Sequence, residues 1–128
     1  MSHSQKLFVM ALRVRKQFLY ENRKNVKAAI IVWDQQEKYL DRKHVIEAAW
    51  NWINMTIPVI SSTFASFSRM CKNLGAETLG HLFIDEAGQA LPQAAVGAIY
   101  RSRHVMVVGD PLQIKPVLTL DSNTLYML

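Results

Sequence analysis

Apolar residues in the first half of the chain recur at intervals of three and four positions, the spacing of one face of an α-helix. The first series predicts an amphipathic helix near the start, and two more predict helices after it. The three series are Leu7, Met10, Ala11, Val14 and Phe18; Val26, Ile30 and Trp33; and Ile46, Ala49, Trp50 and Ile53. Asp41 precedes the third series and is the expected helix cap. Residues 1–56 are therefore expected to form a helical segment.

After residue 56 the pattern changes to short apolar runs rich in branched residues, which are typical of strands buried on both faces. Such runs occupy residues 57–60, 82–84 and 105–108, and helical patterns at Phe64–Leu74 and Pro92–Ile99 lie between them. This alternation predicts an α/β layer of three parallel strands joined by crossover helices. Residues 57–128 are expected to form this second part.

Charge separates the two parts further. Residues 1–56 hold ten Lys and Arg against five Asp and Glu, whereas residues 57–128 hold five against five, so the whole net charge of +5 lies in the helical segment. Basic residues such as Lys6, Arg13, Arg15 and Lys16 suit contact with a polyanion such as nucleic acid. The alternative is a solvated helix face, and the sequence favours this second interpretation.

Cysteine usage and hydropathy bear on where the protein works. The single Cys71 cannot form an internal disulfide, and the start has no secretory signal, so an intracellular compartment is expected, cytoplasmic or nuclear. Cys71 lies on an apolar helix stripe, which favours a core role over a nucleophilic one. The longest uncharged stretch, Ala48–Ser68, is polar and contains Pro58, so no membrane helix is expected.

Candidate chemistry gathers where the predicted strands end, because ligands of parallel α/β sheets bind beyond the carboxyl ends of the strands. Three polar segments qualify: Ser61–Thr63, Asp85–Gln89 and Gly109–Gln113. In the second, Asp85 can hold Mg²⁺ while Glu86 orients or deprotonates an attacking water. The dipeptide alone is also a common loop feature, so specificity must come from its context.

That context resembles superfamily one helicases of the nonsense-mediated-decay and senataxin-like group. Residues 81–90 (HLFIDEAGQA) look like that group's motif II, and residues 107–116 (VVGDPLQIKP) look like its motif III. Residues 59–63 resemble the segment that precedes motif II. The resemblance covers about Ile57–Val117 and implies a partial RecA-like P-loop ATPase sheet that works with ATP and Mg²⁺.

Carried over by position, the resemblance implies a nucleotide site. Asp85 would bind Mg²⁺, and Glu86 would activate water. Gln113 would sense the terminal phosphate, in a loop shaped by Gly109 and Asp110. The structural alternatives are that Gln113 is a solvated loop residue and that Gly109 only permits a sharp turn.

The resemblance also implies a path for single-stranded DNA or RNA. Ser62 and Thr63 would contact its phosphates, which positions a strand without reading its sequence. Gln89 would couple the nucleotide state to this path. Ser62 and Thr63 could equally cap the helix that begins near Phe64, and capping does not exclude phosphate contact.

A phosphate-binding loop is missing from the sequence. Such a loop ends in Gly-Lys followed by Ser or Thr, and no Gly-Lys pair occurs anywhere in the chain. The chain is therefore expected to be an internal fragment of a longer helicase that is inactive alone. Its exposed strand edges are expected to cause self-association or an altered strand order. Two alternatives stay open: a non-catalytic domain that binds nucleic acid or protein, and an Mg²⁺-dependent phosphohydrolase that uses Asp85 and Asp110.

Overall fold

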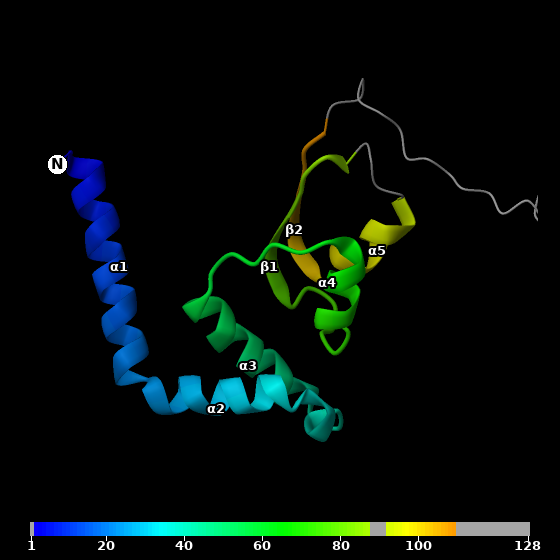
Figure 1. Ribbon diagram of the computed structural model, residues 1–128, viewed down its shortest axis with the longest axis horizontal. Coiled ribbons are helices and arrows are strands. Elements are labelled where there is room, and N and C mark those ends of the chain that lie inside the picture. The colour runs from blue at the N-terminus through cyan, green and yellow to red at the C-terminus, as the bar shows by residue number, and fades with distance from the viewer. Residues whose placement is uncertain (1, 88–91, 110–128) are drawn as a thin grey trace, which may run out of the picture. The chain divides into compact units, whose positions relative to one another are not determined.

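The computed structural model describes residues 2–87 and 92–109, which form an α/β arrangement of helices and a parallel sheet (Figure 1). The chain divides into two compact units, Met1–Ser62 and Thr63–Leu128, and each is described by itself. The expected division between residues 56 and 57 stays a prediction. In the described ranges, no helix has both the length and the apolar character that a membrane crossing requires.

The first unit opens with the long helix α1 (His3–Glu21), as the apolar spacing predicts. Ser2 and Gln5 start it with a reciprocal capping box: the Gln5 amide donates to Ser2 Oγ (3.3 Å), and the Ser2 amide donates to Gln5 Oε1 (2.7 Å). No residue of α1 is buried. Its main aromatic contact is near its end, where Phe18 stacks on Trp52 with ring centroids 5.9 Å apart.

The core of the first unit lies between α2 (Arg23–Asp34) and α3 (Lys43–Thr56), which a 3-10 turn, η1 (Gln36–Tyr39), connects. Its buried side chains are Ala29, Ile46, Ala49 and Trp50, and the last three belong to the predicted third series. Trp33 packs edge-on against Trp50. The three predicted helices are therefore confirmed, and so is the inner face of α3. The predicted inner faces of α1 and α2 are wrong: α1 has no buried residue, and Ile30 of α2 is 49% exposed because α2 packs against α3 through the side that carries Ala29.

The expected cap of α3 is wrong by one position. Arg42, not Asp41, occupies the N-cap, and no side chain caps the helix there. The reason is the turn that precedes α3: the Arg42 amide donates to the Tyr39 carbonyl (2.8 Å), which closes the turn and sets the helix start one residue later. Asp41 lies beside the Arg42 guanidinium instead, at 3.7 Å on an exposed surface where such a pair adds little stability.

The second unit contains a parallel pair of strands, β1 (Leu79–Ile84) and β2 (Ser102–Val107), joined by a crossover through α5 (Pro92–Tyr100). The short helix α4 (Phe64–Met70) precedes them and packs against α5. The core of this unit consists of Cys71, Leu74, Ile84 and Ala98. Two of the three predicted strands and the helix predicted at Pro92–Ile99 are confirmed, whereas the helix predicted at Phe64–Leu74 ends at Met70.

The third predicted strand, at residues 57–60, is not formed: the described residues make a two-stranded sheet, β1–β2. A strand exists only where its backbone pairs with another, and here the Ile57 amide is used to end α3 by donating to the Ile53 carbonyl (2.7 Å). Pro58 has no N–H to donate. The apolar run lies exposed instead, with Val59 at 82% of its full exposure.

Candidate functional site

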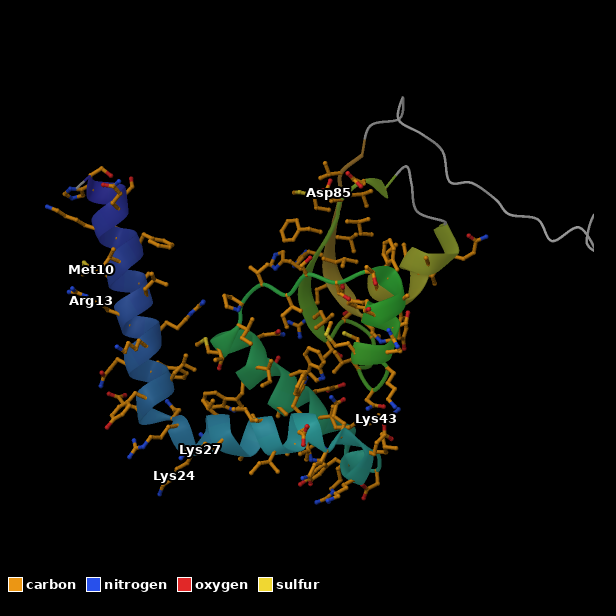
Figure 2. The ribbon with its side chains drawn as sticks, in the orientation of Figure 1. Met10, Arg13, Lys24, Lys27, Lys43 and Asp85 are labelled. Carbon is orange, nitrogen blue, oxygen red and sulfur yellow. The ribbon has the colours of Figure 1, made fainter. Side chains whose placement is uncertain are left out.

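The acidic pair Asp85–Glu86 lies at the carboxyl end of β1, where Figure 2 shows Asp85. The buried Ile84 anchors the end of the strand in the core, and both acidic residues after it are exposed. The Glu86 amide donates to Asp85 Oδ1 at 2.8 Å, which fixes one carboxylate oxygen against the chain. The other oxygen has no hydrogen-bond partner among the described residues and faces no ion pair there.

Glu86 adopts a left-handed backbone conformation, with φ of 51°. A residue with a Cβ enters this region at a cost of about 1–2 kcal/mol, so surrounding contacts must maintain it. Strain of this kind concentrates at functional sites, where it aims a side chain that a regular strand would point elsewhere. The left-handed turn places the carboxylates of Asp85 and Glu86 on a bend instead of on an extended strand.

Two backbone hydrogen bonds hold this bend against the end of β2. The Val108 amide donates to the Ile84 carbonyl (2.7 Å), and the Ala87 amide donates to the Val108 carbonyl (3.1 Å). Gly109 follows Val108 directly, so it lies near the same edge of the sheet as Asp85 and Glu86. The polar ends of the two confirmed strands therefore come together. Ser61–Thr63 was predicted to join them by way of the third strand, which is not formed.

The chemistry available at this edge suits Mg²⁺, which commonly binds through one or two carboxylates and completes its octahedron with water and phosphate oxygens. Asp85 fits that requirement with one unengaged carboxylate oxygen. No group of three or more His, Cys, Asp or Glu residues that could hold a metal occurs in the parts of the chain that the structure describes. A magnesium ion here would therefore need ligands in addition to the described side chains. Gln89, Asp110 and Gln113 lie outside the described residues.

Thr63 caps α4, as one of the two interpretations of the Ser/Thr cluster predicts. Its Oγ1 accepts a hydrogen bond from the Ser66 amide (3.3 Å), and its carbonyl accepts one from the Phe67 amide (2.8 Å). Ser62 and Thr63 are both exposed. Phosphate contact by these two residues stays a prediction.

Cys71 belongs to the core and not to the site, as its position on the apolar stripe predicts. Only 1% of its surface is exposed, and this burial raises its pKa from 9.0 to about 11, an effect that the nearby Arg101 charge partly opposes. A thiol with such a pKa is almost entirely protonated at neutral pH. The thiolate required for nucleophilic attack is therefore scarce.

Sequence reasoning missed the residue that joins the elements behind the site. The Arg101 side chain donates from Nε to the Leu74 carbonyl (3.1 Å) and from Nη1 to the Gly97 carbonyl (2.9 Å), so it ties the turn before β1 to the helix before β2. Both hydrogen bonds are partly buried. Only the placement of a basic residue between a helix and a strand marks Arg101 in the sequence, and that signal is weak.

Comparison with known proteins gives one family. A family model described as an AAA domain matches residues 3–120. No curated protein and no solved structure matches the chain. The matched range covers most of both units, including Asp85 and Glu86.

Proposed function

We propose that this chain is part of an ATP-driven helicase motor. The chain belongs to the AAA domain family of helicase-like P-loop ATPase domains, and the proposal proceeds from that membership. The observation that carries this proposal is the acidic pair Asp85–Glu86 on a left-handed bend at the carboxyl end of a parallel strand, hydrogen-bonded to the end of the next strand. This is where an α/β sheet collects its ligands. In this proposal the chain contributes the hydrolytic element of the motor.

In the proposed mechanism Asp85 would hold Mg²⁺, which would supply positive charge to the phosphates of ATP, and Glu86 would position the attacking water and accept its proton. The exposure of both side chains supports these roles. Gln113 would sense the terminal phosphate from the loop that contains Gly109 and Asp110. Gly109 supports this part of the proposal because it follows the strand end that is bonded to Ala87.

A single strand of DNA or RNA is the proposed track. Ser62 and Thr63 would contact its phosphates, and Gln89 would link this contact to the state of the nucleotide. The exposed position of Ser62 and Thr63 at the start of α4 supports the contact. Because hydroxyl contacts with phosphates carry no base information, the motor would bind strands of any sequence.

The phosphate-binding loop would come from elsewhere in a longer parent protein, since the sequence contains no Gly-Lys pair. Without backbone amides and a lysine around the phosphates, the chain alone would bind nucleotide poorly and hydrolyse none. The exposed apolar run at residues 57–60 fits the same proposal. In the parent it would pair as a further strand of the completed sheet.

The proposal is tested by nucleic-acid-stimulated ATP hydrolysis in the longer parent. The substitution Glu86→Gln removes the base while it preserves the shape of the side chain, so kcat should fall by about 100-fold or more and ATP binding should persist. Glu77→Gln is the matched control, because Glu77 is also an exposed glutamate in the left-handed conformation, with φ of 54°, but lies before β1 at the other end of the strand. Equal activity of the parent and its Glu86→Gln variant would contradict the proposal.

The second candidate is a non-catalytic domain that binds nucleic acid through its helical unit. Its supporting observation is the surplus of basic residues there, with Lys24 and Lys27 on the side of α2 that points away from α3 (Figure 2). Phosphate contact would make the logarithm of the binding constant fall linearly with the logarithm of salt concentration. Binding of this kind in a parent with no ATPase activity would favour the second candidate. Hydrolysis of simple phosphate esters by this chain alone would instead favour the phosphohydrolase.

A further inference from the structure

An apolar stripe on the N-terminal part of α1 has no partner among the described residues. It consists of Leu7, Met10 and Val14, spaced three and four residues apart on one side of the helix. These side chains are 63%, 59% and 69% exposed. One turn further along, Phe18 stacks on Trp52 of α3 and is covered in part. The stripe therefore begins as a packing surface at its C-terminal end and continues uncovered toward the start of the helix.

Cations flank this stripe. Lys6 and Arg13 each precede a stripe residue by one position, which places both on the same flank, and Arg15 lies on the other flank. None of these charges forms an ion pair within the described ranges, and α1 has no acidic residue before Glu21 at its end. Figure 2 shows Met10 and Arg13 on the side of α1 that points away from α3. The surface thus combines exposed apolar groups with uncompensated positive charge.

The spacing matches one seam of a pair of packed helices. Leu7, Met10 and Val14 occupy the a, d and a positions of a heptad, and Lys6 and Arg13 then occupy g positions, which pair with charges on the facing helix. A partner that satisfies both properties is an amphipathic helix with apolar residues on its own seam and Asp or Glu beside it. Recognition of this kind buries the seam and neutralises the flanks together.

Other occupants satisfy only part of this surface. Nucleic acid would neutralise Lys6 and Arg13 but would leave the stripe exposed to water. An antiparallel second copy of α1 would bring the cations at the g positions together, and a parallel copy would leave them unpaired because the facing e positions are Ala11 and Phe18. A bilayer requires one continuous apolar sector, whereas the exposed Phe8 and Leu12 lie on another side of the helix, about 100° or more around its axis from Leu7.

We propose that the stripe Leu7–Met10–Val14 of α1 is a docking site for an acidic amphipathic helix of another protein. The partner helix would lie along α1 and would end near Phe18, because the next d position is the polar Gln17 and Trp52 already covers Phe18 in part. This inference does not rest on the proposed motor function. Binding at α1 and hydrolysis at Asp85–Glu86 can therefore fail independently.

The probe is a synthetic three-heptad peptide with Leu at its a and d positions and Glu at its e and g positions, added to the full chain and followed by fluorescence anisotropy. The stripe on α1 spans little more than one heptad, so binding should be saturable with a Kd on the order of 100 micromolar or tighter. A peptide with Lys in place of Glu should bind at least tenfold more weakly, since its charges repel Lys6 and Arg13. Equal binding of the two peptides would overturn the proposal.

Two pairs of variants locate the site. Val14→Asn should weaken binding of the Glu peptide at least tenfold, while Ile31→Asn, which changes an exposed apolar residue of α2, should leave it unchanged. The double change Lys6→Glu with Arg13→Glu should reverse the preference toward the Lys peptide, whereas Lys24→Glu with Lys27→Glu should not. All six positions are exposed, so the helical fold should persist, and circular dichroism verifies it.

Two further arms distinguish the other occupants. The chain could bind phosphatidylserine vesicles more tightly than the Glu peptide. If Val14→Asn abolished this vesicle binding, the stripe would be assigned to a membrane surface and the proposal would be overturned. A single-stranded oligonucleotide could also compete with the Glu peptide for the chain. If Lys6→Glu with Arg13→Glu abolished this competition and Val14→Asn did not affect it, the surface would be assigned to nucleic acid and the proposal would be overturned.

Discussion

At the scale of the residue, the left-handed Glu86 has an energetic consequence that can be measured. Replacing it with glycine removes the clash between Cβ and the backbone, so Glu86→Gly should raise the free energy of unfolding by about 1 kcal/mol. Glu86→Ala keeps the Cβ and should bring no such gain. Urea unfolding of the full chain followed by circular dichroism compares the two variants. Equal free energies of unfolding for the Glu86→Gly and Glu86→Ala chains would mean that the left-handed backbone at this position does not destabilise the fold.

Cys71 makes stability depend on pH at the alkaline end. Its pKa is about 11 in the folded chain against an ordinary value of 9.0, so the unfolded chain releases the thiol proton first. The stabilisation is complete below about pH 9 and is lost as the pH rises from there to about 11, by roughly 1.4 kcal/mol per unit. Cys71→Ala should lack this extra slope, which unfolding in urea at a series of pH values would detect.

Sequence and structure agree unevenly at single positions. Thr63 was identified as one of two possible caps, and its bond to Ser66 confirms that interpretation. Asp41 was assigned to a cap that Arg42 occupies. The left-handed Glu86 could not be predicted, because a motif with glycine at that point would be the usual signal and the contacts that hold Glu86 come from Val108, distant in the chain.

At the scale of the element, Arg101 couples α5 to the turn before β1. Arg101→Ala removes two hydrogen bonds to carbonyls and should lower the free energy of unfolding by about 1–3 kcal/mol. A Cβ built on Gly97 would lie 3.2 Å from Arg101 Nη1, so Gly97→Ala should displace the guanidinium.

The coupling between Gly97 and Arg101 can be isolated by a double-mutant cycle. In the Arg101→Ala chain, Gly97→Ala should stabilise by about 1 kcal/mol because alanine favours helix. In the unmodified chain the same change should stabilise less, since it disturbs Arg101. Additive effects of the two substitutions would show that the guanidinium moves aside at no cost.

Helices were more predictable than strands for a physical reason. The bonds of α1, α2, α3 and α5 are local, and their apolar spacing shows directly in the sequence. A strand needs a partner, and the partner of residues 57–60 is missing from the described sheet although their composition fits a strand. β1 and β2 formed as predicted because α5 returns the chain to pair them in parallel.

At the scale of the whole molecule, the two-stranded sheet leaves apolar surface exposed. Phe83 and Met106 are paired in register, so they lie side by side on one face, and both are largely exposed. Parallel sheets are usually covered on both faces, which favours association of copies of this chain. Light scattering after size-exclusion should therefore detect species larger than a monomer.

Charged substitutions on that face provide the control. Phe83→Lys with Met106→Lys should shift the chain toward monomer, whereas Leu7→Lys with Val14→Lys on α1 should not. A chain that is already monomeric at tens of micromolar would contradict the expected self-association. Dissociation by the α1 variants instead would assign the contact to the first unit.

The family was predictable from two motif-like segments, and the match to an AAA domain over residues 3–120 confirms it at that level. The helical segment offered no such signal in the sequence, although the matched range includes nearly all of it. The function of this segment depends on which of its surfaces stay exposed, and exposure is set by the packing of the folded chain and not by local sequence.

The backbone bonds between Ala87, Val108 and Ile84 also set an order of events during synthesis. Asp85 and Glu86 leave the ribosome before β2 does. Until Val108 has emerged, its carbonyl cannot accept the hydrogen bond from the Ala87 amide. The acidic pair therefore acquires its geometry late, by closure of a loop of about twenty residues. A message truncated before Ser102 would encode both carboxylates without the partner that orders them.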